Sequence, residues 1–299
     1  KFYKFKTIDE RVDFYLGTLK NKYKKIDKNK LKTIEELLEK KKITRKYVWE
    51  VYYHALYLNI LKTANIKGKF DYHMQDVVTF SPSHYYKLMK NRTANSNNGV
   101  LLKSLDYDRH WKYYFEKPKD IDFSLKKNMI IWRGTTSGFI SRKPNRFDLV
   151  KKWFNKNENI NVGFNNITLN SSLKLDKYVL DRVEPEEMLK YKYILSIEGN
   201  DKDSGLQWKL NSNSVVLMPR PTITSWLMET TLVPNYHYVL INDNYSDLYE
   251  KLEWCNKNQN RCIEIVKNAN LFMKQFMNNN SENYIEKQVL NEYFRLVNN

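Results

Sequence analysis

Residues 129–138 have the sequence MIIWRGTTSG, in which a short apolar run ends in an arginine, a glycine and three hydroxyl side chains. Two later stretches also contain a short apolar run that ends at a glycine or a proline. They are residues 193–199, YILSIEG, and residues 215–219, VVLMP. Short apolar runs that alternate with amphipathic segments are typical of parallel strands buried between helices. The sequence therefore predicts an α/β fold whose ligands bind beyond the carboxyl ends of the strands.

The composition sets limits on the protein but selects no function. The 299 residues can form two domains, and 41% of them are hydrophobic. The net charge of +17 suits a polyanionic partner, yet the lysines are spread over polar segments, so an ordinary solvated surface accounts for the charge as well. Two cysteines without metal-site spacing indicate a reducing compartment.

The chain contains no apolar run of transmembrane length and no recognisable signal peptide. The expected location is therefore cytoplasmic, in the host cytoplasm if the protein is viral, and peripheral membrane association stays open. Residue 1 is Lys, which also leaves open the removal of an upstream segment that carried an anchor.

The loop after the first apolar run has the groups that a diphosphate requires. Arg133 offers a planar charged donor fork, Gly134 lets backbone N–H groups approach closely, and Thr135 and Thr136 add hydroxyl donors. No Gly-Lys-Ser/Thr element follows, so the loop is not a Walker loop. The alternative is a glycine turn with a surface arginine.

The loop after the second run, which begins at Gly199 and Asn200, leads into a short predicted helix. Ser204 and Gly205 lie at the start of that helix. Free N–H groups and the positive end of the helix dipole favour an anion at such a position. This loop is the second predicted contact for a nucleotide diphosphate.

Asp201 and Asp203 in the same loop match the Asp-x-Asp spacing of metal-dependent glycosyltransferases. The same spacing occurs at residues 106–108 and 120–122, so the match is weakly specific. No zinc motif and no local Ser-His-Asp arrangement is present. We therefore expect no metal site, with Asp201 and Asp203 as the alternative.

The segment from Thr224 to Thr230, which follows the third run, is expected to be helical. Glu229 would then lie one helical turn after Ser225 and on the same face. A carboxylate at this place can accept hydrogen bonds from ribose hydroxyls. The alternative is an ordinary exposed glutamate.

Three blocks, in this order, resemble glycosyltransferase family 90, the group of Rumi-type protein O-glucosyltransferases and capsule-associated xylosyltransferases, in its bacterial or viral branch. They are residues 131–136 (IWRGTT), residues 190–200 (KYKYILSIEGN) and residues 213–254. The resemblance extends from about Val100 to Phe276. It implies a GT-B fold with two Rossmann-like domains facing a central cleft. We expect an acceptor-side domain with helical additions at 1–125 and a nucleotide-sugar domain at 126–299, whose last helix packs back on the first domain.

The activity that the resemblance implies is transfer of xylose or glucose from a UDP-sugar to a hydroxyl of a glycan or glycoprotein. The transfer would invert the anomeric carbon and need neither a metal nor another cofactor. By the same resemblance, the loop from Arg133 to Ser137 and the region from Gly199 to Ser204 would hold the nucleotide diphosphate.

The family's catalytic base is an aspartate, and its counterpart here is Asp76 in the stretch QDVVTFSP, with Asp71 and Asp108 as fallbacks. The segment Arg109-His110-Trp111 resembles a cleft element that contacts donor or acceptor. Rumi-type members have an arginine after the glycine loop where this chain has Gly205. Lys209 or Arg133 would then supply the missing cation.

Three other functions stay open on the sequence alone. The first is a non-catalytic protein that binds anionic glycan or nucleic acid, although no nucleic-acid motif supports it and we expect no such partner. The second is a metal-dependent GT-A transferase that uses Asp201 and Asp203. The third is a catalytically inactive relative that binds sugar nucleotide without turnover. The oligomeric state is not predicted.

Overall fold

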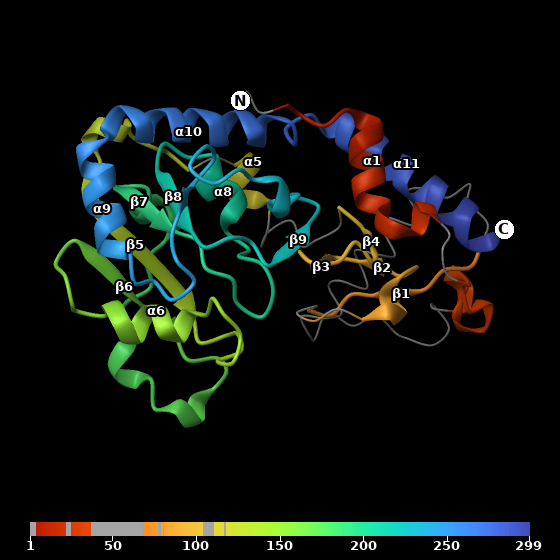
Figure 1. Ribbon diagram of the computed structural model, residues 1–299, viewed down its shortest axis with the longest axis horizontal. Coiled ribbons are helices and arrows are strands. Elements are labelled where there is room, and N and C mark those ends of the chain that lie inside the picture. The colour runs from red at the N-terminus through yellow and green to blue at the C-terminus, as the bar shows by residue number, and fades with distance from the viewer. Residues whose placement is uncertain are drawn as a thin grey trace. The chain divides into compact units, whose positions relative to one another are not determined.

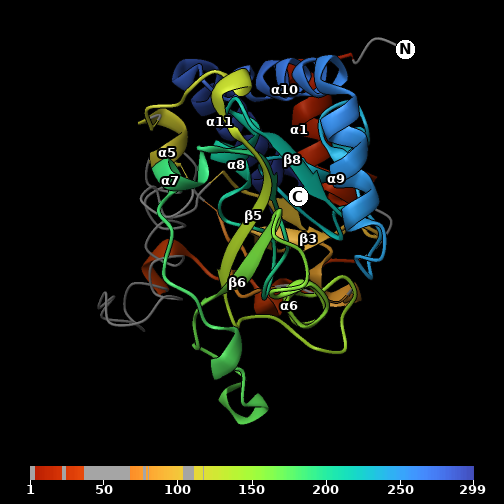
Figure 2. The ribbon, with the colours of Figure 1, turned by 90° about the vertical axis from the view of Figure 1, so that its left-hand side faces the viewer.

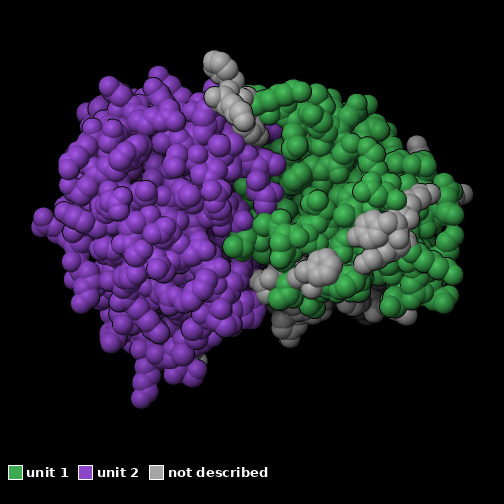
Figure 3. All heavy atoms as spheres, viewed as in Figure 1, with its two compact units in different colours: residues 1–107, 222–229, 276–299 green, residues 108–221, 230–275 purple. Residues whose placement is uncertain are grey.

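The computed structural model describes residues 4–21, 25–36, 68–76, 79, 81–103, 111–116 and 118–299. The chain forms two compact units, each assembled from separate segments (Figures 1 and 3). Unit 1 comprises residues 1–107, 222–229 and 276–299, and unit 2 comprises residues 108–221 and 230–275. The expected domain boundary at residues 125–126 falls inside unit 2, and the last helix belongs to unit 1.

Unit 2 contains a five-stranded parallel sheet, which confirms the predicted α/β class. Across the sheet its strands are β10 (Val239–Leu240), β8 (Val215–Met218), β7 (Tyr191–Leu195), β5 (Lys127–Thr135) and β6 (Ile160–Asn166). Numbered along the chain from β5, this is the order 5-4-3-1-2, which is the doubly wound flavodoxin-like order. The three apolar runs predicted as strands correspond to β5, β7 and β8.

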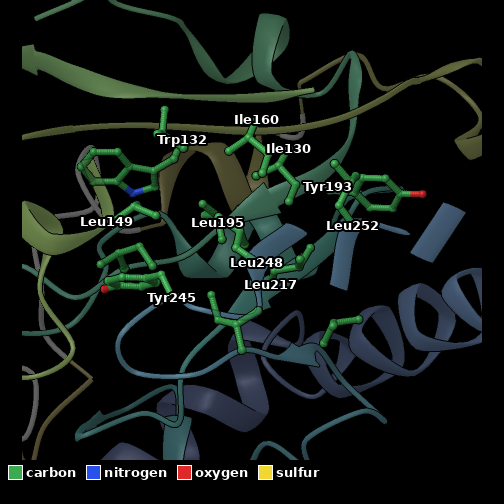
Figure 4. Packing of buried hydrophobic residues seen from close by; sticks show 14 of the residues in the cluster. Ile130, Trp132, Leu149, Ile160, Tyr193, Leu195, Leu217, Tyr245, Leu248 and Leu252 are labelled. Carbon is green, nitrogen blue, oxygen red and sulfur yellow. The ribbon is translucent and has the colours of Figure 1, made fainter. Parts of the chain in front are cut away.

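Alternate side chains of β5 and β7 enter two separate hydrophobic clusters. Ile130, Trp132 and Tyr193 belong to the larger cluster, which is shown in Figure 4. Ile131 and Ile194, which lie between them in sequence, belong to the smaller one. Because successive strand side chains point to opposite faces, the sheet is covered on both sides.

Helices from several parts of unit 2 supply the two covers, and Figure 2 shows them around β5 and β6. The larger cluster includes residues of α6 (Arg146–Trp153), α9 (Leu248–Lys257) and α10 (Gln259–Lys274). The smaller one involves α7 (Pro185–Met188) and α8 (Leu206–Leu210), and the short α5 (Lys112–Phe115) precedes the sheet. None of the helices in the described ranges combines the length and apolar character needed to cross a membrane.

In its described residues, unit 1 joins the helices α1 (Ile8–Leu16) and α11 (Asn279–Asn298) to short strands. The strands β1 (Tyr72–His73), β2 (Leu88–Met89) and β4 (Val100–Leu101) form a parallel sheet in this order, and β3 (Asn91–Thr93) pairs antiparallel with β9 (Ile223–Ser225).

A buried polar network joins the three chain segments of unit 1. The Arg11 guanidinium of α1 donates to both carboxylate oxygens of Glu282 in α11, at 2.5 and 3.0 Å. Trp226 donates from its indole nitrogen to the same carboxylate at 2.7 Å. Its ring also stacks on Tyr15 at 3.8 Å between centroids. Because the charges are buried and paired with each other, the network fixes how the three segments meet.

The prediction of a helix from Thr224 to Thr230 is wrong. Residues 223–225 form strand β9, and only a short 3-10 turn at Glu229–Thr231 follows. Thr224 lies opposite Arg92 of β3 in the antiparallel pair. Pairing with a distant strand therefore overrides the local preference of this segment.

Candidate functional site

The strand order of unit 2 reverses at β5. The chain passes from β5 to β6 on one side of it, and then crosses to β7 on the other side. Beside such a switch point, doubly wound sheets bind their ligands at the carboxyl ends of the strands. The loops that follow β5 and β7 there are residues 136–145 and 196–205, and they include half of the predicted nucleotide contacts.

Two glycines bring these loops together. Gly138 has φ +112°, and a Cβ atom on it would lie 3.2 Å from the carbonyl oxygen of Gly199. The Gly138 N–H donates to the side-chain oxygen of Asn200 at 2.8 Å. A Cβ on Gly199 would lie 2.8 Å from the guanidinium of Arg146. The backbones can approach this closely only because both residues lack a side chain.

Arg146 is the cation at this junction. Its guanidinium donates to Ser137 Oγ at 2.7 Å, and to the carbonyl oxygens of Thr135 and Ile197 at 3.3 Å each. It thus binds both loops at once. Arg146 is the first residue of α6, whose start is capped by Asn145, which accepts from the Asp148 N–H at 2.8 Å. An arginine held so firmly offers a fixed positive charge beside two glycine loops.

A second arginine and a glutamate complete the junction. Arg142 forms an ion pair with Glu198, and the two side chains are 14% and 13% exposed. Arg142 also approaches the Gly199 carbonyl oxygen at 3.5 Å. With Arg146, the junction has two guanidinium groups and one carboxylate, so its local charge is positive and suits an anion.

Arg142 and Arg146 were not among the predicted site residues. A signal was present in the sequence, because both arginines follow the apolar run at 129–132 within about fifteen residues. Arg133, which directly follows that run, was the more conspicuous arginine. The long loop brings its own far end back to the strand tip, which strand-end reasoning alone does not predict.

Arg133 is directed away from the junction. It lies within β5, and its guanidinium donates to the backbone oxygen and the side-chain oxygen of Asn161, at 3.2 and 2.8 Å, and to the Asp181 carbonyl oxygen at 3.2 Å. Asn161 pairs with Ile131, two residues before Arg133. The side chain therefore extends back along β6, and the structure does not bring it to the glycine loops.

The other predicted residues of the first loop divide into two groups. Thr135 donates from its hydroxyl to Ser137 Oγ at 3.0 Å, at the junction. Thr136 is fully buried and donates to the Leu169 carbonyl oxygen at 2.5 Å, so it anchors the loop to the segment after β6. Gly134 lies in β5 against the ring of Trp132.

Asp203 of the second loop and Lys209 of α8 form a buried ion pair at 2.5 Å. Asp203 also accepts from Ser196 Oγ at 2.7 Å and from the Gly205 N–H at 2.9 Å, and Lys209 donates to the Leu195 carbonyl oxygen at 3.1 Å. Burial opposes ionisation of Asp203, but the Lys209 charge and these hydrogen bonds lower its pKa.

The contacts of this ion pair bear on two predictions, the Asp201/Asp203 metal site and Lys209 as the cation for the leaving group. Both oxygens of Asp203 are bonded to protein donors, so the arrangement does not support a metal ligand in the Asp201/Asp203 pattern. Lys209 is 6% exposed and holds the end of β7, so it does not stand open as the cation for a leaving group. Ser204, at the start of α8, is partly exposed and close to the same loop.

Glu229 lies in unit 1, where it is 2% exposed. Its two carboxylate oxygens accept from the N–H and the hydroxyl of Ser225, at 2.6 and 2.7 Å. The predicted proximity of these two residues is present, although it comes from a strand and a turn rather than from a helix. Its predicted contact with ribose stays a prediction.

Unit 1 also contains the predicted base. The Asp76 carboxylate is 37% exposed and pairs with the ammonium of Lys90. The fallback Asp71 is less exposed, at 16%, and its oxygens contact the Tyr72 N–H at 2.8 Å and Lys87 at 3.6 Å. Asp76 is therefore the more accessible carboxylate of the two.

Of the predicted contact segment Arg109-His110-Trp111, the structure describes only Trp111. Its side chain is 5% exposed and packs against the rings of Tyr114 and Phe115 in unit 2. Arg109 and His110, as well as the fallback base Asp108, lie outside the described residues. A sugar contact by this segment stays a prediction.

This chain is similar to one protein family as a whole and to individual known proteins. The model of Glycosyl transferase family 90 matches residues 106–299. O-glucosyltransferase LpsA of Dichelobacter nodosus is 31% identical over 246 residues, which cover 82% of this chain and 73% of that protein. Uncharacterized protein 179R of Invertebrate iridescent virus 6 is 33% identical over 103 residues, and the chain spans only 9% of its length.

Among solved structures, HepE of Anabaena in complex with UDP-glucose aligns with 58% of this chain and 55% of its own. The aligned residues are 12% identical and the TM-score is 0.37. This similarity is too low to carry an argument about fold or ligand.

The buried Asp203–Lys209 pair predicts an acid-sensitive stability. In Asp203→Asn the ammonium of Lys209 stays buried without its counter-charge, so the free energy of unfolding should fall by about 3–5 kcal/mol. Because folding lowers the pKa of Asp203, the stabilisation is present above the pKa of the unfolded aspartate and disappears as pH falls through the folded value. Urea unfolding of both proteins at pH 7 and at steps down to about pH 2, below the usual pKa of an aspartate, measures both effects.

Asp201→Asn is the matched control, since it removes the other aspartate of the same spacing. It should lower the free energy of unfolding by less than Asp203→Asn does, because Asp203 is the counter-charge of the buried Lys209. The structural role of Asp203 would be contradicted if both variants lost the same free energy of unfolding and a chelator removed the difference from the wild-type protein. That result would favour a metal shared by the two aspartates.

Proposed function

Because this chain belongs to glycosyl transferase family 90, we propose that it transfers a sugar from a UDP-sugar to a hydroxyl of a glycan or glycoprotein, with inversion and without a metal. That it is a glycosyltransferase follows from the family. The proposed donor residues lie in unit 2, and the proposed base Asp76 lies in unit 1.

The observation that carries the donor site is the junction of the β5 and β7 loops. A pyrophosphate site needs several groups at one point, and Gly138 and Gly199 let the two loops and Arg146 meet there. It also needs fixed positive charge, which Arg146 provides, since its guanidinium is held by both loops. The same charge stabilises the diphosphate as it leaves, without reorganisation during the reaction.

Glucose is the first donor sugar to test, because the relative at 31% identity is named an O-glucosyltransferase. Xylose, the other sugar predicted from the sequence, is the second. The acceptor stays at the level of a hydroxyl on a glycan or a protein. The positive charge of the chain adds no further selection among acceptors, since it is not concentrated in one motif.

A metal-free reaction is proposed from the contacts of the second loop. Asp203 has both oxygens bonded to Ser196, Lys209 and the Gly205 N–H. The guanidinium groups at the junction can take the part that a divalent cation plays in neutralising a diphosphate.

The chemical step requires a base for the acceptor hydroxyl. In the proposed step, Asp76 accepts the hydroxyl proton as the acceptor oxygen bonds to the anomeric carbon. The bond between that carbon and the β-phosphate oxygen breaks on the opposite side, and UDP leaves with the electron pair. Single displacement of this kind inverts the anomeric configuration.

Exchanging the two arginines separately tests the donor site. Arg146→Met should weaken UDP binding at least tenfold, because one charge-assisted hydrogen-bonding group contributes about 1.5–3 kcal/mol. Arg133→Met is the matched control, because that guanidinium bonds to Asn161 and Asp181; it should change the affinity less than about twofold. Calorimetric titration with UDP, with and without EDTA, measures this.

The donor assignment fails if Arg133→Met loses UDP and Arg146→Met keeps it, with both variants folded as judged by thermal melting. A requirement for divalent cation, seen as loss of UDP binding in EDTA, would contradict the metal-free proposal.

Replacement of the base should affect turnover alone. Asp76→Asn should lower kcat for transfer by about a hundredfold or more, the usual size of base catalysis, while UDP affinity stays unchanged. Asp71→Asn is the control and should keep kcat within about threefold. Steady-state kinetics with UDP-glucose and UDP-xylose give both values. Normal turnover in Asp76→Asn would refute the assignment of the base.

A further inference from the structure

Lys90 is a buried lysine that faces an exposed carboxylate. Its side chain is 2% exposed and its ammonium pairs with Oδ1 of Asp76, whose side chain is 37% exposed. The two residues are fourteen positions apart. Lys90 lies between β2 and β3, and the strand pairing on both sides fixes its backbone.

The burial of the Lys90 ammonium has a cost in free energy. A lysine loses its hydration when it is buried, and a partner that stays partly in water compensates this incompletely. Exposed lysines of unit 1 form pairs without this cost, as Lys20 does with Asp13 at 2.6 Å. The pairing with Asp76 offsets part of this cost, and it brings a buried cation to an exposed carboxylate.

The other buried cations of unit 1 bind different groups. Arg92, on β3, donates to the carbonyl oxygens of Gly99 and Phe14 at 3.0 and 2.6 Å. Arg11 pairs with Glu282. Lys87 is 20% exposed and pairs with Asp71 at 3.6 Å. Among the described residues, Lys90 is the cation paired with Asp76.

The pairing leaves one side of the carboxylate open. Oδ1 accepts from Lys90, whereas Oδ2 accepts no hydrogen bond from any residue that the structure describes. A carboxylate held through one oxygen cannot rotate freely, and its second oxygen keeps a defined direction. A base requires such an orientation, because a displacement of about 1 Å can cost a hundredfold in rate.

We propose that Lys90 is a positioning residue for Asp76: it holds Oδ1 from the interior and so aims Oδ2 at the acceptor hydroxyl. This inference rests on the proposed function, in which Asp76 is the base. Lys90 acts through Asp76 and contacts neither donor nor acceptor. Its removal should therefore lower kcat and leave UDP binding unchanged.

A double-mutant cycle tests the proposal. Lys90→Met should lower kcat about tenfold or more in the wild-type background, because the carboxylate loses its fixed orientation. In the Asp76→Asn background the same change should lower kcat less than about twofold, because there is no base left to orient. Transfer kinetics with UDP-glucose and calorimetric UDP binding are measured on all four proteins.

Lys20→Met is the control for loss of a lysine charge in unit 1, since its partner is exposed; it should keep kcat and UDP affinity. If Lys90→Met does not fold, Lys90→Gln, which keeps a neutral hydrogen-bond donor, goes through the same cycle. Thermal melting establishes that each variant is folded.

Equal losses of kcat in both backgrounds would overturn the proposal, since they show a structural role. Unchanged kcat in Lys90→Met, beside a large loss in Asp76→Asn, would overturn it as well. Failure of the proposed function gives a different result: the wild-type protein transfers no sugar, or Asp76→Asn turns over normally.

Discussion

The candidate site depends on the close approach of two backbones at the carboxyl edge of the sheet in unit 2. Any other residue at Gly138 would be strained at φ +112° and tight against the Gly199 carbonyl oxygen, and a Cβ on Gly199 would displace the Arg146 guanidinium. The approach occurs where the strand order reverses, which is where doubly wound sheets bind their ligands. Arg146 lies across this contact and bonds to both loops. The glycines therefore determine where the charge is placed.

What each cationic side chain can bind depends on the protein groups that already hold it. Arg133 and Lys209 are conspicuous in the sequence, but Arg133 donates to Asn161 of β6, and Lys209 donates to the Leu195 carbonyl oxygen and to Asp203. Arg142 and Arg146 also bond to protein oxygens, but the loop after β5 brings both of them to the junction. In unit 1 the same distinction separates Arg92, which binds carbonyl oxygens, from Lys90, which binds Asp76. The net charge of +17 does not reveal these differences.

The sequence predicted the parts of the fold that depend on local pattern. The apolar runs at β5, β7 and β8 were identified because short runs of consecutive apolar residues that end at glycine or proline are typical of buried parallel strands. The loops after β5 and β7 were identified as a candidate site because they follow these strands directly. The pairing of β3 with β9 was not predictable, because it joins residues that are far apart in the chain. That pairing turned an expected helix at Thr224 into a strand.

The sequence was least informative about the direction of side chains. The sequence does not show which way the side chains of Arg133 and Arg146 point. Only the register of β5 against β6 shows that Arg133 extends back toward Asn161. Asp203 likewise has the spacing of a metal ligand, but it forms an ion pair with Lys209, which lies in the last turn of α8. Spacing predicts which residues can be near each other, whereas packing decides what each side chain binds.

The most direct test of the donor site is hydrogen–deuterium exchange of the protein with and without saturating UDP. Binding at the junction predicts slower exchange in peptides that cover residues 134–147 and 196–205, because the backbone N–H groups of both loops become ordered around the diphosphate. Protection confined to the peptides that surround the Arg133 side chain, residues 159–166 and 180–182, would contradict the account, as would saturable UDP binding without protection of either loop.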